Sequence, residues 1–335
     1  MCFNKFSHPT KMKSTLLKSL LTIACLLCSV ASYAYDFAVD GIYYNITNSS
    51  EKTVEVTYKE DSYAGTINIP ETVSYQGATY RVTGIGYLAF YRCYIIKITI
   101  PNSVISIGES SFSYCTTLTS ITIPNSVASI SKFAFYGCEG LTEITIPNSV
   151  TSISTRAFAG CTSLTTVNFN AENCTSMGSS EYPVFNNCGS LKTINIGDNV
   201  KSIPDYAFKG CTGLTDITIP NNVTAIGASA FTRSGLTRIT IGSGVTSIGN
   251  SAFYNCTSLT TVNFNAENCT SMGSSIHPVF NNCSSLKIIN IGANVKSIPD
   301  YAYSYCSGLI EIIIPNGVAY IGDEAFKSCT YLKSV

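Results

Sequence analysis

The sequence contains no tryptophan, only two histidines and few charged residues. Charged side chains make up 12% of the 335 residues, and 20 basic residues balance 20 acidic ones. A chain without net charge has no long-range field that attracts nucleic acid or anionic lipid, so we expect neither as a partner. Hydrophobic residues, by contrast, make up 45% of the chain, with 21 tyrosines and 16 phenylalanines. This composition excludes a disordered chain and provides apolar side chains for a sizeable core.

Long apolar runs are also scarce, and the main one lies near the start of the chain. Ser19–Val30 (SLLTIACLLCSV) follows the basic stretch Lys11–Lys18, and Ser32 and Ala34 are small residues with cleavage-site spacing. This pattern predicts a secretory signal peptide over residues 1–34. The run is shorter than the roughly 18–20 apolar residues that span a bilayer. We therefore expect an exported mature chain without a transmembrane segment.

The shortage of histidine removes most catalytic and metal-binding motifs. His8 lies in the predicted leader, and His277 occupies the place that Tyr182 has in a second copy of the same segment, so we interpret His277 as a turn residue. No paired-histidine zinc helix, phosphate loop or nucleophile elbow occurs. Scattered carboxylates are predicted to lie too far apart for a glycosidase pair. We expect no enzymatic activity, no catalytic residue, no metal and no cofactor.

What the sequence has instead is a repeat. An aromatic residue followed three positions later by cysteine recurs in steps of 22 to 27 residues, and Phe231 belongs to the series with Ser234 in the cysteine place. The other pairs are Phe90/Cys93, Phe112/Cys115, Phe135/Cys138, Phe158/Cys161, Phe185/Cys188, Phe208/Cys211, Phe253/Cys256, Phe280/Cys283, Tyr303/Cys306 and Phe326/Cys329. Both steps of 27 contain the insert VNFNAENCTSMGSS, at Val167–Ser180 and Val262–Ser275, so the array also repeats every 95 residues.

Each unit reads as a short β strand followed by turns, as in Leu118–Cys138. Its first six residues alternate apolar and polar, which predicts a half-buried strand. Pro124 ends that strand, because proline has no N–H to donate. A second short strand near Ile130 and one helical turn containing Phe135 and Cys138 are predicted to follow. One unit cannot bury its own apolar face, whereas stacked units can, so the sequence predicts a solenoid.

The cysteines leave two alternatives open. No Cys-x-x-Cys motif follows residue 34, and ten cysteines occupy the repeat position while Cys174 and Cys269 lie in the inserts. Cysteines one coil apart have a Cα separation that permits disulfides, and export favours pairing. Ser234, however, indicates that a coil closes without cysteine, and a free thiol is a good small core residue. We therefore favour free, buried thiols over disulfides.

The repeat strings, such as IPNSVASISKFAFYGC at Ile123–Cys138, closely resemble the BspA-like class of leucine-rich repeats, from residue 65 to 335. Tyr35–Ile46 resembles the amino-terminal cap of that family. The resemblance implies a curved right-handed solenoid, mostly β, with a parallel concave sheet, single helical turns and a β cap over residues 35–64. It also implies a secreted or cell-surface adhesin, but carries over no ligand residues. Because Leu332–Val335 falls within the strand of a twelfth coil, we expect an array truncated in mid-repeat.

A ligand is predicted to bind on the outward side of the strands. Outward positions of the strands carry mainly threonine, serine and asparagine, with an apolar end at Ile288 and Ile313. One interpretation is that these residues only form a soluble strand surface, since threonine has a high β propensity. The other is a large, weakly charged contact surface for a protein or a glycan. Isolated charges at the third strand position are the candidate ligand-contact residues: Lys97, Glu143, Asp216, Arg238 and Glu311.

The leading hypothesis for function is a monomeric binding module that contacts host matrix proteins, glycans or other cells through the solenoid face. The alternative is a structural spacer that displays a missing C-terminal domain or anchor.

Overall fold

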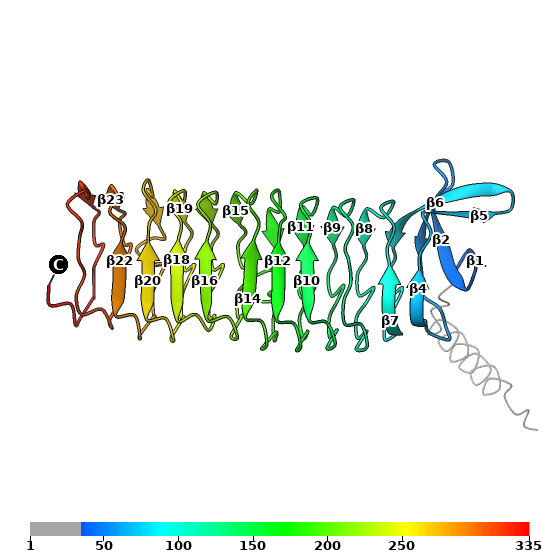
Figure 1. Cartoon of the computed structure of the whole chain (residues 1–335), viewed down its shortest axis with the longest axis horizontal. Coiled ribbons are helices and arrows are strands. Elements are labelled where there is room, and N and C mark those ends of the chain that lie inside the picture. The colour runs from blue at the N-terminus through cyan, green and yellow to red at the C-terminus, as the bar shows by residue number, and fades with distance from the viewer. Residues whose placement is uncertain (1–34, 335) are drawn as a thin grey trace, which may run out of the picture. The chain divides into compact units, whose positions relative to one another are not determined.

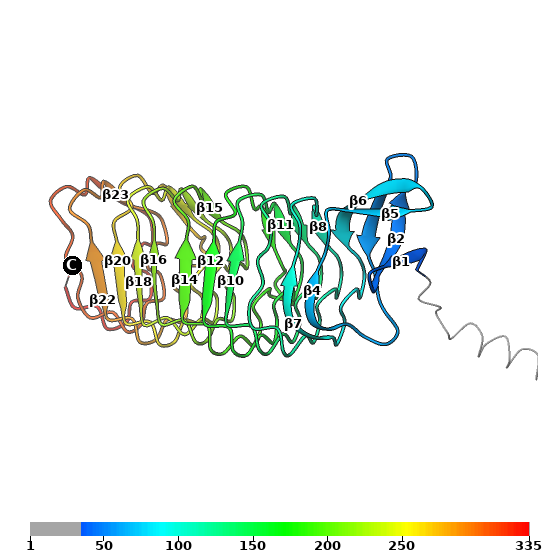
Figure 2. The ribbon, with the colours of Figure 1, turned by 45° about the vertical axis from the view of Figure 1, so that its right-hand side comes forward.

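The structure is a computed structural model that describes residues 35–334. The predicted signal peptide, residues 1–34, and Val335 lie outside the described residues. Residues 35–334 form one row of stacked coils (Figure 1), as the repeat predicts. Most coils contribute one strand to a row that we call the strand face, and most contribute a second, shorter strand to another row (Figure 2).

The strand face consists of parallel strands in register. Its members are β4 (Ala64–Asn68), β7 (Tyr94–Thr99), β10 (Glu143–Ile146), β12 (Thr166–Phe169), β14 (Thr193–Ile196), β16 (Asp216–Ile219), β18 (Arg238–Ile241), β20 (Thr261–Phe264) and β22 (Ile288–Ile291). The register places equivalent repeat residues opposite each other, for example Glu143 opposite Thr166 and Asp216 opposite Arg238. The pairing is interrupted around residues 118–123, after β14 and after β22.

The second row consists of two-residue strands at the predicted second strand position. They are β8 (Ser106–Ile107), β9 (Ser129–Ile130), β11 (Ser152–Ile153), β13 (Ser176–Met177), β15 (Ser202–Ile203), β17 (Ala225–Ile226), β19 (Ser247–Ile248), β21 (Ser271–Met272), β23 (Ser297–Ile298) and β24 (Tyr320–Ile321). This row is interrupted after β13 and after β21, so the interruptions repeat at the same interval as the inserts.

Before the first coils, the chain forms antiparallel strands. β1 (Phe37–Val39) pairs with β2 (Ile42–Asn48), which pairs with β3 (Thr53–Val56). β5 (Thr72–Tyr75) pairs with β6 (Ala78–Ile85), and β6 joins β3 to the second row through parallel pairing. β1, β2 and β3 lie within residues 35–64, where the sequence predicts a cap, whereas the β5–β6 hairpin lies after them. Together these strands cover the first strand edge of the second row.

The core is a continuous stack of aromatic rings. The aromatic residue of each repeat, from Phe90 through Tyr303 to Phe326, packs against its equivalent in the next coil with ring centroids 5.0 to 5.9 Å apart. Almost all of these rings are fully buried. Burial of each ring therefore depends on the coils on both sides, as stacking of half-buried units requires.

The predicted helical turn is wrong in its geometry, since the described residues contain no helix. In the coil around Phe135, the N–H of Ala134 donates to Ser131 O at 3.2 Å, whereas the N–H of Phe135 donates across to Ala157 O of the next coil at 2.7 Å. Phe133 and Gly137 have φ values of +57° and +68°. A right-handed helix needs negative φ at every residue. The segment is therefore a series of β-turns whose intervening N–H groups bond to the neighbouring coil.

The cysteines of the described residues are free thiols. All of them are buried except Cys329, which is half-buried. Most thiols of the repeat position donate to the carbonyl of the stacked aromatic residue one coil earlier, for example Cys115 to Phe90 O at 3.0 Å and Cys138 to Phe112 O at 3.0 Å. Burial raises the pKa of the Cys138 thiol to about 12. A thiol that stays protonated and buried is a poor nucleophile, so Cys138 acts as a core residue.

Tyr303 gives a stability prediction. Its hydroxyl is buried, and no group of the described residues donates to it or accepts from it. The equivalent residue 95 positions earlier is Phe208. An unpartnered buried hydroxyl costs about 1–3 kcal/mol, so Tyr303→Phe is expected to raise the free energy of unfolding by about 1 kcal/mol. The midpoint of thermal unfolding measures the change, and the exposed Tyr305→Phe is the control, whose midpoint is expected to stay the same. A lower midpoint for Tyr303→Phe contradicts the prediction.

Candidate binding surface

The candidate contact residues all lie on the strand face, at the position that points away from the core. Alternation along the strand explains this: in β10 the side chains of Glu143 and Thr145 are exposed while Ile144 and Ile146 are buried. The five candidates, Lys97, Glu143, Asp216, Arg238 and Glu311, are exposed. Their orientation therefore agrees with the strand register inferred from the repeat.

The structure brings two of the five candidates together. Asp216 and Arg238 occupy neighbouring strands, with Asp216 Oδ1 4.0 Å from Arg238 Nε and both side chains 63% exposed. Such an exposed pair contributes only about 0.2–1 kcal/mol to stability, so both groups are available to a partner. Glu143 accepts a hydrogen bond from Asn168 Nδ2 at 2.6 Å. Lys97 lies on β7, beyond the interruption at residues 118–123, and Glu311 lies beyond the interruption after β22.

Two amide ladders on this face were not singled out from the sequence. Asn168 Nδ2 donates to Thr145 Oγ1, and Asn195 Nδ2 donates to Asn168 Oδ1 at 2.8 Å. Ninety-five residues later the same pattern recurs, with Asn263 bonded to Thr240 and Asn290 Nδ2 donating to Asn263 Oδ1 at 2.8 Å. The signal in the sequence is the recurrence of asparagine at the fifth strand position of consecutive units.

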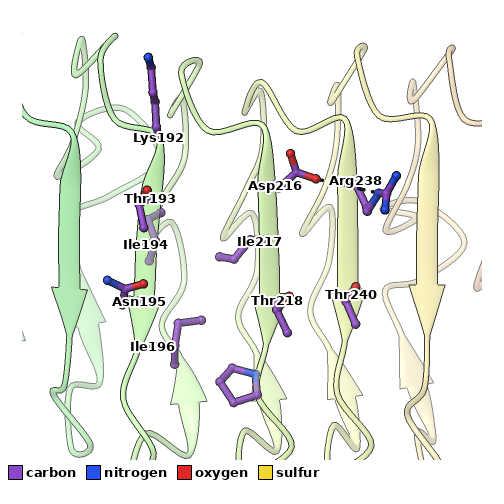
Figure 3. A pocket seen from close by; sticks show the side chains of 11 residues that line it. Lys192, Thr193, Ile194, Asn195, Ile196, Asp216, Ile217, Thr218, Arg238 and Thr240 are labelled. Carbon is purple, nitrogen blue, oxygen red and sulfur yellow. Dashed lines mark ion pairs between the residues drawn. The ribbon is translucent and has the colours of Figure 1, made fainter.

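Each ladder ends beside a groove. The first groove lies between β14 and β16, where the strand ladder stops and a new one begins. Lys192, Asn195, Asp216 and Arg238 line its polar part, as Figure 3 shows. Ile194 and Ile217 lie in its floor and are 7% and 6% exposed, whereas the equivalent Ile239 of the paired strand β18 is fully buried. The interruption therefore opens the core slightly beneath a rim of charged and amide groups.

The second groove is the same structure 95 residues later. Lys287, Asn290 and Glu311 take the places of Lys192, Asn195 and Asp216. Two outward positions differ, because Ile288 and Ile313 replace Thr193 and Thr218 and are 50% and 76% exposed. Both grooves follow one coil after an insert. The two grooves thus share one backbone arrangement, and the second has more apolar residues on its outward positions.

Groups suited to catalysis or metal binding do not gather on this surface. Among residues 35–334, no cluster of three histidine, cysteine, aspartate or glutamate side chains could hold a metal ion. His277 is exposed in a turn, where its backbone N–H donates to Ser274 Oγ at 3.2 Å. Within the same part of the chain, no helix has the length and apolar character needed to cross a membrane.

Stacked 22- to 27-residue coils, a parallel strand face and a buried aromatic stack define a leucine-rich-repeat scaffold. The family model for the BspA type leucine rich repeat region matches residues 83–183, 179–310 and 277–335. The chain therefore belongs to the BspA-type leucine-rich repeat family, as the repeat strings predict.

Two solved structures of similar proteins agree with this assignment. A leucine-rich repeat protein from Bacteroides ovatus has 28% sequence identity and a TM-score of 0.51, with 89% of this chain and 94% of that chain covered. A leucine rich cell surface protein from Faecalibacterium prausnitzii has 27% identity and a TM-score of 0.50, with 89% and 93% covered. No curated protein matches the sequence.

Proposed function

We propose that this protein is an exported, surface-displayed adhesin-like module that binds a partner protein through its strand face. The observation that carries the proposal is the first groove, where Asp216 and Arg238 stand exposed above a partly open apolar floor. Arginine and aromatic or apolar anchors dominate the energetics of protein interfaces. Family membership supports a binding role, and the similar protein from Faecalibacterium prausnitzii is described as a cell surface protein.

The arrangement also fits a repeated, extended contact. The hydroxyl and amide groups of Thr145, Asn168 and Asn195 form a flat ladder that leads to the groove. A large surface of modest hydrogen bonds gains affinity through the number of simultaneous contacts rather than through one strong site. Extracellular matrix proteins and glycoproteins, which are large and repetitive, are the class of partner that we propose.

Charge reversal at Arg238 tests the proposal. We expect saturable binding of the purified protein to at least one of immobilised fibronectin, fibrinogen, laminin and mucin, and about tenfold weaker binding for Arg238→Glu. The substitution removes the cation and places a second carboxylate beside Asp216. Surface plasmon resonance measures both affinities.

Arg233→Glu is the matched control, because Arg233 is exposed in the turn just before β18 and the charge change is identical. The control is expected to bind like the unmodified protein. Absence of binding to all four ligands by a folded protein would instead favour the spacer hypothesis, and equal loss in both variants would remove the strand face as the site.

A further inference from the structure

A second surface with a defined chemistry lies on the turns between the second short strand and the cysteine of the early coils. We call it the aromatic–cationic strip, and its members are Tyr91, Arg92, Tyr114, Lys132, Phe133, Tyr136, Arg156 and Tyr182. Its rings form a chain of edge-to-face contacts. Ring centroids are 6.0 Å apart for Tyr91 and Tyr114, 5.2 Å for Tyr114 and Tyr136, and 5.4 Å for Tyr136 and Phe133. The strip is therefore a continuous surface across consecutive coils.

Cations lie over the faces of these rings. The Arg92 guanidinium is 5.2 Å from the ring centroid of Tyr91 and 5.4 Å from that of Tyr114. The Arg156 guanidinium is 4.4 Å from the Tyr182 centroid, and Lys132 Nζ is 4.9 Å from that of Phe133. A cation held over a ring loses part of its conformational freedom before any partner arrives, which lowers the entropic cost of binding.

The backbone at the strip is strained in a way that glycine would relieve. Arg92, Tyr114, Phe133 and Arg156 have φ values of +57°, +61°, +57° and +54°. Bulky residues adopt this left-handed region at a cost of order 1–3 kcal/mol. The positions of the next two coils that correspond to Arg92 and Tyr114 are Gly137 and Gly160. At the position of Arg92 and Tyr114, the strip therefore keeps large side chains where two other coils have glycine.

The cations of the strip also lack acidic partners. The two ion pairs found between residues 35 and 334 join Arg238 to Asp216 and Lys327 to Glu324, so neither involves Arg92, Lys132 or Arg156. Arg156 Nε is buried and donates to no acceptor of the described residues. The nearest acid along the chain to Tyr182 is Glu181, which raises the pKa of the Tyr182 hydroxyl through a hydrogen bond and its charge. Donor capacity at the strip thus exceeds what the protein satisfies.

We propose that the aromatic–cationic strip docks an acidic, extended segment of a partner protein. A guanidinium that lies flat on a ring presents its N–H edge outward, and this edge matches a carboxylate in a bidentate arrangement. Arginine and tyrosine are also the residues that dominate hot spots of protein interfaces. An acidic polysaccharide fits less well, because the ring faces that would stack on sugars are already covered by Arg92, Arg156 and Lys132.

A labelled poly-glutamate peptide is the probe for this strip, and fluorescence anisotropy with the full chain is the measurement. We expect saturable binding that weakens about tenfold for Arg92→Glu. Arg92 is exposed, so its substitution leaves the core intact. The matched control is Arg233→Glu, which has the same turn position, a φ of +58° and no aromatic contact among the described residues. Its binding is expected to stay unchanged.

Strand-face variants separate this proposal from the proposed function. Arg238→Glu is expected to leave poly-glutamate binding unchanged while weakening binding to the matrix ligand. The strip proposal is overturned by absence of poly-glutamate binding, by equal loss in Arg92→Glu and Arg233→Glu, or by binding of heparin in place of poly-glutamate. The last result would identify an acidic glycan as the partner.

Discussion

Replacing Phe208 with alanine is expected to lower the free energy of unfolding by about 3–5 kcal/mol. The ring is fully buried, with centroids 5.9 Å from Phe185 and 5.6 Å from Phe231, and its edge meets Phe169 at 6.0 Å. Truncation removes contacts with three rings of the two adjacent coils and leaves a cavity between rings that the backbone of each coil holds in place. Equilibrium denaturation in urea measures the change.

Thr212→Ala, an exposed substitution in the same coil, is the control and is expected to change stability by less than about 0.5 kcal/mol. A repeat array can unfold in steps, so denaturation curves recorded with two different probes are compared with each other. If Phe208→Ala and Thr212→Ala have the same small effect, the stacking register described above is wrong.

Gly235→Ala is expected to destabilise the protein by about 2–3 kcal/mol, as overpacking does in a close-packed interior. Gly235 follows Ser234 in one of the coils that is a residue short, and a Cβ added there would lie 2.0 Å from the carbonyl oxygen of Thr212. That oxygen belongs to the backbone of the preceding coil and cannot rotate away. The Gly235 N–H also donates to Cys211 O at 3.1 Å, so the two coils cannot separate without losing this bond.

Gly189 provides the control, because it lies in the corresponding turn, one residue further from the following leucine than Gly235, and an added Cβ there would have no atom within 4 Å. Gly189→Ala is expected to be neutral or slightly stabilising, since alanine restricts the unfolded chain. The midpoints of thermal unfolding of the two variants test the prediction. Equal midpoints would contradict the prediction, because they would show that the preceding coil gives way to the added methyl group.

The aromatic stack and the strand face could be predicted because they depend on spacing alone. Phe135 and Cys138 recur with the repeat, and a parallel stack must then place equivalents on top of each other. The same argument places Asp216 beside Arg238. The helical turn could not be predicted correctly, because apolar residues at Ile130, Ala134 and Cys138 have the spacing of a helix. Only the backbone shows that the N–H of Phe135 bonds to the next coil.

The grooves could not be predicted from the strand sequences. Thr193–Ile196 alternates like the strands that pair on both sides, yet the ladder ends there. Both grooves follow a coil that contains an insert, and both share the surrounding sequence, such as VFNNC at 184–188 and 279–283. The strip was missed for another reason: Tyr91, Tyr114 and Tyr136 do not occupy one repeat position, so no alignment of units brings them together.

The hydrogen bonds that the core thiols donate affect how such a chain can gain or lose coils. Most cysteines of the repeat position donate to a carbonyl of the preceding coil, as Cys115 does to Phe90 O, and need no second cysteine. A coil can therefore be gained or lost without leaving an orphaned partner, which a ladder of disulfides would not allow for single coils. The 95-residue duplication and the replacement of one cysteine by Ser234 are the kinds of inherited change that such a modular core tolerates.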